Sequence, residues 1–178
     1  GSVRHRRAAP GMKRLLNVGG GTSALPEQFS EYQVVTLDIA PETKPDIVAS
    51  MCDMGGIGPF DVVWCCHALE HIYPHEVPVA LSEFLRVLKP GGHAIIFVPD
   101  LEGVKADESP LYYDPSGPVT GLDLIYGHRV AMRDNPYMAH HTGFVAVTLT
   151  QALLKAGFAS AESSRQPLFN LLGVGIKA

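Results

Sequence analysis

The chain has 178 residues, of which 46% are hydrophobic and 18% are charged, and its formal net charge at pH 7 is −4. A chain of this length and composition can bury a substantial core as one domain, which excludes an intrinsically disordered protein. The negative charge, the lack of any apolar run of roughly 20 residues and the count of only 3 cysteines together predict a cytoplasmic protein without nucleic-acid partner, membrane span or disulfide framework.

Residues 1–12 are expected to form a flexible tail ahead of a single domain over residues 13–178. The tail holds a basic cluster, Arg4-His5-Arg6-Arg7. Such a cluster could contact phosphates, but at a chain end it is typical of a solvated, frayed terminus.

The domain opens with a strand, Lys13 to Val18, that stops at the glycine turn Gly19-Gly20-Gly21. A short helix or turn over about Ser23 to Glu31 leads to a second strand, Gln33 to Asp38. Glycines let the backbone turn sharply and approach a ligand closely, and an acid at the tip of the second strand can accept hydrogen bonds from ribose hydroxyls. This layout is typical of a nucleoside-binding half of an α/β fold.

The middle of the chain continues the alternation of strands and helices. A short third strand and a glycine-rich loop precede an apolar strand of the kind that is buried on both faces of a parallel sheet. An amphipathic helix follows, is stopped by proline and glycine, and leads into a fifth strand. The expected elements are strand Asp46 to Ala49, loop Met54 to Pro59, strand Phe60 to Cys66, helix His75 to Leu88 and strand His93 to Val98.

Residues 101–141, called the insertion below, interrupt this alternation. They hold prolines, tyrosines and glycines without periodicity, and they are too many for an ordinary connection, which indicates a functional loop or lid. A helix over Val145 to Lys155 and two strands, Ala159 to Gln166 and Phe169 to Lys177, close the chain. The whole pattern predicts an α/β protein with a three-layer, Rossmann-like sheet.

Five segments in this order resemble the class I S-adenosylmethionine-dependent methyltransferases, in particular the small type 11 domains, over about Lys13 to Lys177. They match, in turn, the glycine motif, the ribose-binding acid, the adenine-contacting segment, the fourth strand with its following turn, and the helix end before the fifth strand. The segments are LLNVGGGTS at 15–23, Asp38, Cys52-Asp53-Met54, FDVVWCCHALEHI at 60–72 and LRVLKPGG at 85–92.

The resemblance implies a seven-stranded sheet with order 3-2-1-4-5-7-6 and an antiparallel seventh strand. It also implies S-adenosylmethionine as the cofactor, bound beyond the carboxyl ends of the strands. The residues that it assigns to the cofactor are Asn17, Gly19, Gly20, Gly21, Asp38, Ile39, Cys52, Asp53, Met54, Cys66 and His67.

Three features depart from the family pattern. Asn17 stands where the family usually has an acid, and Ser23 replaces the last glycine of the motif. The N-terminal helices that cover the cofactor in most relatives are expected to be largely absent, because the first strand already begins at Lys13. We therefore expect a site that is open or is covered by the insertion or by a second subunit, which leaves a homodimer as an option.

His71 and His140 are the predicted catalytic residues. His71 lies in the segment expected near the methyl group, where an imidazole with a pKa of about 6.5 can remove a proton from an acceptor. Hydrogen bonding to the cofactor or to a loop is the alternative role. His140 ends the insertion, at a junction that often faces the substrate in the resembling enzymes, and capping of the next helix is the alternative there.

No metal site is expected from the sequence. His67, His71 and His75 are spaced by four residues, but Pro74 argues against one helix carrying all three rings on a common face. Glu70 is expected to be structural, paired with a backbone group or with Arg86.

The sequence thus predicts an enzyme that transfers a methyl group from S-adenosylmethionine to a small molecule, with a hydroxyl oxygen as the first choice of acceptor. Two alternatives remain at this point. An NAD(P)-dependent oxidoreductase would also use a glycine turn and Asp38, although it does not call for the LEHI and LKPGG segments. A non-catalytic relative of the fold would be consistent with Asn17.

Overall fold

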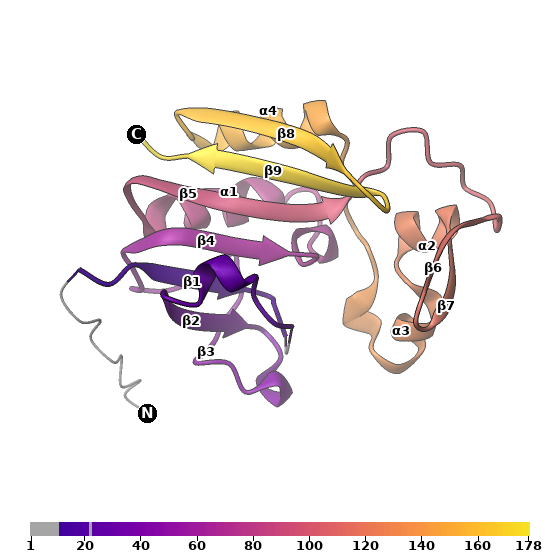
Figure 1. The fold of residues 1–178 in the computed structure, drawn as a ribbon, viewed down its shortest axis with the longest axis horizontal. Helices are drawn as coiled ribbons and strands as arrows, with labels where there is room; N and C mark the ends of the chain where they lie inside the picture. Colours follow the sequence, from indigo (N-terminus) through magenta and orange to yellow (C-terminus); the bar gives the residue numbers. More distant parts are fainter. Residues whose placement is uncertain (1–10, 22) are drawn as a thin grey trace.

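The computed structural model describes residues 11–21 and 23–178, so most of the predicted tail lies outside the described residues. One seven-stranded sheet organises them, with the strand order β3-β2-β1-β4-β5-β9-β8 (Figure 1). Its strands are β1 (Arg14–Val18), β2 (Gln33–Asp38), β3 (Ile47–Val48), β4 (Phe60–Cys66), β5 (Leu88–Pro99), β8 (Ser160–Gln166) and β9 (Asn170–Ile176).

Strands β1 to β5 run parallel to one another, whereas β9 lies antiparallel between β5 and β8. Since β6 and β7 belong to a separate hairpin, β8 and β9 are the sixth and seventh strands of this sheet. The expected order and the antiparallel last strand are therefore confirmed. The parallel arrangement matters for function because it brings the carboxyl ends of β1, β2 and β4 to one edge.

The larger part of the core lies between one face of the sheet and two helices, α1 (Val77–Val87) and α4 (Ala146–Ala156). Leu81 and Phe84 of α1 and Leu149 and Leu153 of α4 have no exposed surface. The apolar positions recur at helical spacing, as the sequence predicted, because each helix buries one stripe of side chains against the sheet. The predicted helices 75–88 and 145–155 thus differ from α1 and α4 only at their ends.

The opposite face of the sheet carries a smaller cluster, built on Leu15, Phe29, Val62 and Trp64. The helix expected over residues 23–31 is only a single 3-10 turn, η1 (Glu27–Phe29). Pro26 stands immediately before this turn, and only Phe29 of the turn is buried. Phe29 and Trp64 make an edge contact with ring centroids 5.5 Å apart. Phe29 thus packs on this face of the sheet, where the apolar side of the expected helix would have packed.

The insertion, in which the sequence shows no periodicity, nevertheless contains regular secondary structure. It folds into a hairpin followed by short helices, and Figure 1 shows it beyond the carboxyl ends of β4 and β5. Each element is too short for periodicity to reveal it. The elements are β6 (Pro110–Asp114), β7 (Gly117–Thr120), α2 (Gly121–Tyr126), α3 (Arg129–Asp134) and η4 (Pro136–Met138).

A reciprocal cap holds the start of α2. The Asp123 N–H donates to the Thr120 hydroxyl, and the Asp123 carboxylate accepts from both the Thr120 N–H and its hydroxyl. Burial raises the pKa of Asp123, but these hydrogen bonds and those from Arg129 outweigh it and lower the pKa to about 2. The sequence T-x-x-D at 120–123 is the readable signal for this helix start.

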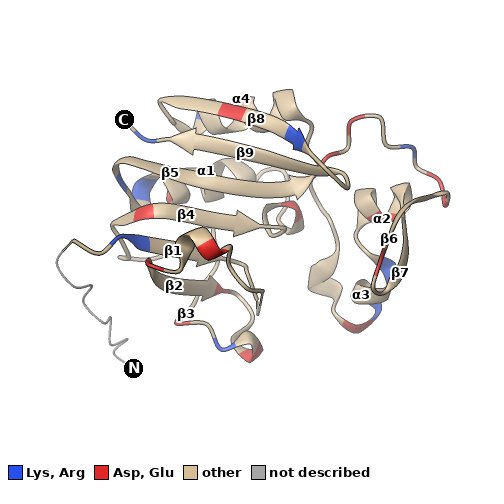
Figure 2. Ribbon diagram, viewed as in Figure 1, with Lys and Arg blue, Asp and Glu red and all other residues tan. Residues whose placement is uncertain are grey.

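Two properties of the described surface bear on partners. Among residues 11–21 and 23–178, no helix has the length and apolar character that crossing a membrane requires. Figure 2 shows Lys and Arg scattered among Asp and Glu along the ribbon, with no gathering of basic residues along any element of this part of the chain.

Replacing Thr120 with alanine tests the cap. Loss of such a cap costs about 0.5–2 kcal/mol, so amide hydrogen exchange in α2 should speed up by roughly 2- to 30-fold. The control is Thr43→Ala, which removes a hydroxyl that donates only to the Ala40 carbonyl in a distant turn. Unchanged exchange of the α2 amides in the Thr120 variant would contradict the assigned role.

Candidate functional site

The glycine turn after β1 comes so close to its neighbours that side chains do not fit at two positions. At Gly19, where φ is +64°, a Cβ would lie 2.5 Å from the Ala68 Cβ, and at Gly20 it would lie 2.4 Å from Oδ1 of Asn17. Gly21 has φ +53° but faces open space among the described atoms. Close packing thus requires glycine at the first two positions, and a left-handed backbone conformation favours glycine at the third.

Asp38 ends β2 directly beside this turn, as the sequence predicted. Its Oδ2 accepts a hydrogen bond from the Gly21 N–H at 3.2 Å, and its Oδ1 accepts from the Ala40 N–H at 2.9 Å. Ile39 between them is 61% exposed. A carboxylate oxygen has two lone pairs, so Asp38 keeps acceptor capacity for a further ligand.

The predicted adenine segment divides into a buried and an exposed part. Met54 is buried, and its N–H donates to Oε2 of Glu83. Asp53 is exposed. Its Oδ1 accepts a hydrogen bond from the Gly55 N–H at 3.3 Å, which is the local turn that aspartate commonly forms with the backbone two residues further along the chain. Cys52 is half-buried, and burial raises the pKa of its thiol. Asp53 and Cys52 therefore remain accessible to a ligand, while Met54 serves the core.

Asn17 packs under the glycine turn instead of facing outward. It is buried, and its Oδ1 has no hydrogen-bond partner among the described residues. A buried polar atom without a partner is costly, so this position carries unused acceptor capacity directly behind the turn.

The end of β4 turns sharply into η3 (Leu69–His71). His67 takes the left-handed conformation at φ +51°, and its Nδ1 lies 3.3 Å from Oε1 of Glu70. Burial lowers the pKa of His67, but the Glu70 carboxylate raises it more, so the pKa lies above its ordinary value. Cys66 is only partly buried, and burial likewise raises the pKa of its thiol.

His71 and His140 lie side by side, although 68 residues separate them in the sequence. Their ring centroids are 5.0 Å apart, and the edge of one ring faces the other. Nδ1 of His71 lies 3.1 Å from the Ala139 carbonyl, and Nδ1 of His140 lies 2.9 Å from the Leu124 carbonyl. Burial lowers the pKa of His140, which favours a neutral ring at pH 7.

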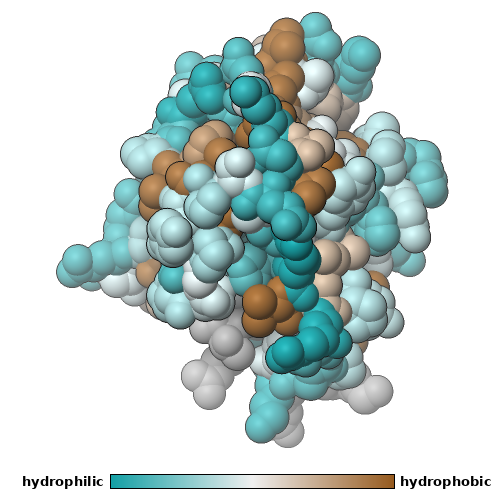
Figure 3. Space-filling model, turned by 90° about the vertical axis from the view of Figure 1, so that its right-hand side faces the viewer, coloured by the Kyte–Doolittle hydropathy of each residue, from teal (hydrophilic) through white to brown (hydrophobic). Residues whose placement is uncertain are grey.

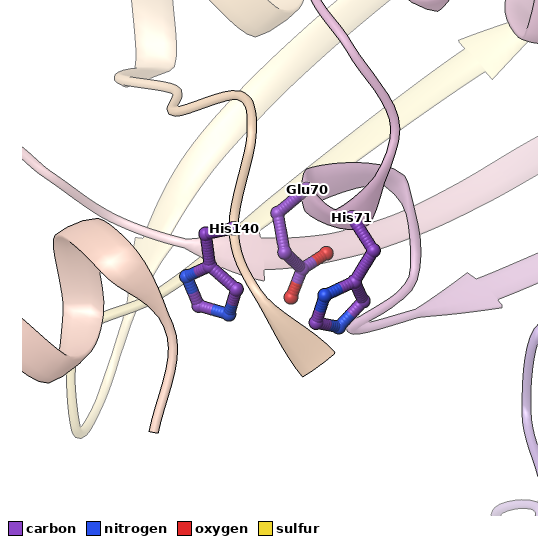
Figure 4. A group of neighbouring side chains, drawn as sticks. All are labelled: Glu70, His71 and His140. Atoms are coloured by element: carbon purple, nitrogen blue, oxygen red, sulfur yellow. The ribbon is translucent and has the colours of Figure 1, made fainter. Parts of the chain in front are cut away.

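Glu70 is the residue that the sequence reading assigned differently. The suggested pairing with Arg86 is wrong, because Arg86 binds Glu83 at 2.6 Å and the Gly55 carbonyl. Glu70 is instead 1% exposed and points toward His71 and His140 (Figure 4). The sequence shows Glu70 and His71 side by side after a buried strand, but His140, which completes the group, comes from the insertion.

The insertion adds aromatic surface on this side of the molecule. Three of its four tyrosines, Tyr113, Tyr126 and Tyr137, are exposed, whereas Tyr112 stacks on Phe169. The tyrosines therefore do not form a core of the insertion. Figure 3 shows a band of hydrophilic residues down this side, with hydrophobic residues gathered to either side of it.

The glycine turn generates a direct test. Gly19→Ala and Gly21→Ala both force alanine into a left-handed conformation, which costs about 1–2 kcal/mol, but only the first adds a collision with Ala68. Chemical denaturation should therefore show a larger loss of unfolding free energy for Gly19→Ala. Equal losses in the two variants would mean that the close approach at Gly19 is not a constraint.

Comparison with known proteins relates the segments of this site to a methyltransferase domain. The family model of a methyltransferase domain matches residues 16–96. A search of curated protein sequences found no significant match.

Solved structures resemble the chain over nearly its whole length. The apo S-adenosylmethionine-dependent methyltransferase SibL aligns with a TM-score of 0.62 and 19% identity over 93% of this chain and 50% of its own. A methyltransferase of the same cofactor class from Archaeoglobus fulgidus aligns with a TM-score of 0.62 and 15% identity over 94% of this chain and 87% of its own.

A third structure carries ligands. It is the 1,6-didemethyltoxoflavin-N1-methyltransferase of Burkholderia thailandensis with 1,6-didemethyltoxoflavin and S-adenosylhomocysteine bound, at a TM-score of 0.57 and 15% identity over 94% of this chain and 72% of its own. At such identities these likenesses establish the fold. The chain spans about half the length of SibL.

Proposed function

Since residues 16–96 and the sheet order place this chain among the class I S-adenosylmethionine-dependent methyltransferases, we propose that it transfers a methyl group to a small-molecule acceptor. The observation that carries the proposal is the contact of Asp38 with the glycine turn at the carboxyl edge of the sheet. The matched family is a methyltransferase domain, so the comparisons do not favour an oxidoreductase.

The residues at this edge fit the cofactor. The turn has no side chains of its own at Gly19 to Gly21, the Asp38 carboxylate has acceptor capacity next to it, and Asn17 holds an unpaired oxygen behind it. When bound, S-adenosylmethionine supplies a methyl group already activated by its positively charged sulfur. The protein then has mainly to position the reactants, and alignment alone can lower the barrier by roughly 7–11 kcal/mol.

In this proposal each segment at the edge has one task. Asp38 accepts hydrogen bonds from the ribose hydroxyls, and Asp53 with Cys52 borders the adenine. Cys66 and His67, at the end of β4, border the amino-acid portion. Their place at the carboxyl ends of neighbouring parallel strands supports the assignment, since ligands of open α/β sheets bind there.

His71 and His140 act on the acceptor side in this proposal. A carbonyl oxygen only accepts hydrogen bonds, so Nδ1 of His140 carries the proton that it donates to Leu124, and Nε2 keeps a lone pair. Such a nitrogen can accept the proton of a hydroxyl group as its oxygen attacks. A hydroxyl oxygen is therefore our first choice of acceptor atom.

A small molecule is the acceptor class that the surface supports best. The exposed tyrosines of the insertion offer rings and hydroxyl groups beside the site, and the Burkholderia thailandensis neighbour holds a small heterocycle together with S-adenosylhomocysteine. The net charge of −4 and the scattering of Lys and Arg among Asp and Glu along the described chain do not favour a nucleic acid.

Asp38→Ala tests the ribose assignment. Hydrogen bonds to a charged group are worth about 1.5–3 kcal/mol, so calorimetry should show S-adenosylhomocysteine binding weakened by roughly 10- to 150-fold. The matched control is Asp61→Ala, which removes a carboxylate bound to Arg14 and Lys89 at the amino end of β4. Undiminished affinity in Asp38→Ala, or preferential binding of NADH by the wild type, would overturn the proposal.

A further inference from the structure

Three side chains with metal-binding groups converge beside the proposed methyl-transfer site. Glu70 and His71 come from η3, and His140 comes from the end of the insertion (Figure 4). Each offers one possible ligand atom, and the three atoms lie within 4.8 Å of one another. We call these residues the Glu-His-His cluster.

The carboxylate of Glu70 is incompletely satisfied. Glu70 is 1% exposed, and while its Oε1 contacts His67, its Oε2 is buried without a hydrogen-bond partner in the described part of the chain. A buried carboxylate oxygen without a partner is unfavourable, and a cation is one of the partners that makes such burial acceptable. The unpaired Oε2 of Glu70 therefore indicates a missing ligand.

His140 is oriented as metal-binding histidines are. Its Nδ1 donates to the Leu124 carbonyl at 2.9 Å, which fixes both the ring and the tautomer and leaves Nε2 with a lone pair. A histidine ligand almost always donates its second ring nitrogen to such an outer partner. The contact of His67 with Oε1 of Glu70 gives the carboxylate a comparable support.

Hydrogen bonds to backbone carbonyls hold the two halves of the cluster together. The Glu70 carbonyl accepts from the N–H groups of His141 and Thr142 at 2.8 and 3.2 Å, and the Thr142 hydroxyl donates to the Ile72 carbonyl at 2.8 Å. The segment that carries His140 is thus tied to η3 by three bonds that do not involve the ligand atoms. The arrangement is preorganised, which favours ion binding because little order is lost when the ion enters.

We propose that Glu70, His71 and His140 bind a divalent transition-metal ion of the Zn²⁺ type. Two imidazoles and one carboxylate suit Zn²⁺ and its neighbours better than Mg²⁺ or Ca²⁺, which prefer oxygen ligands alone. Three protein ligands leave a position of a tetrahedral ion open, as in catalytic zinc sites. If the proposed function holds, on which this last step rests, that position can receive an oxygen of the acceptor, and with the ion bound the two histidines serve as its ligands instead of accepting the proton themselves.

The test is metal binding itself. The 178-residue chain is freed of metal with a chelator and titrated with Zn²⁺ in a calorimeter and with Co²⁺ in a visible-absorption spectrometer. We expect one bound ion per chain and absorption bands of protein-bound Co²⁺. Glu70→Gln and His140→Gln should each weaken binding by more than about 100-fold, since loss of even an outer partner costs 10- to 100-fold. Two variants guard against one failing to fold.

The matched control is His141→Gln. This histidine is the sequence neighbour of His140, but its ring stacks on Tyr73 with centroids 4.3 Å apart, and it does not belong to the cluster. Zn²⁺ affinity should stay within a factor of about 2 in this variant, the usual effect of a surface substitution away from special features.

Two results would overturn the metal proposal. One is a folded wild type that binds neither Zn²⁺ nor Co²⁺, and the other is binding that survives both cluster substitutions. S-adenosylhomocysteine is titrated into the same metal-free protein, so that the two proposals fail separately. Cofactor binding without metal binding leaves the methyl-transfer proposal standing, whereas metal binding without cofactor binding removes the methyl-transfer proposal and leaves the metal site.

Discussion

The parallel alignment of β1, β2 and β4 is the constraint on which the rest of the molecule depends. Because these strands end at one edge, the glycine turn, Asp38 and the Cys66–His71 segment meet there although they are far apart in the sequence. β4 contributes Val63 and Cys65 to the larger core cluster and Val62 and Trp64 to the smaller one on the opposite face. A slip of one residue would exchange the side chains that the two clusters receive, so their packing fixes the register. Core packing thus determines the geometry of the site.

The sequence predicted this frame because its signals are local and repeated. Apolar runs and turn glycines located six of the seven sheet strands to within one residue at each end. The exception is β5, which begins at Leu88 and not at His93. The family resemblance supplied the order of the strands. The proximity of Asp38 to the glycine turn was predicted and is observed. The buried role of Met54 was not predicted, because an adenine-contact motif and a core position look alike in a single sequence.

Other features depend on contacts that no local pattern encodes. The insertion was predicted as a loop or lid without periodicity because its hairpin and helices are too short to show a repeat. The T-x-x-D pattern of the Thr120–Asp123 cap was visible in the sequence. The expected helix before β2 reduces to η1, with Phe29 packing on Trp64. The approach of His140 to Glu70 and His71 depends on how the insertion returns to η3, and a search for metal ligands at fixed sequence spacing could not find it.

The most direct test of the central claim is a crystal structure of the protein with S-adenosylhomocysteine bound. The account predicts that the ribose hydroxyls contact the Asp38 carboxylate, that the cofactor passes over the glycine turn, and that its sulfur faces the side of the site that carries His71 and His140. A cofactor bound elsewhere, or one whose sulfur faces away from these histidines, would contradict it.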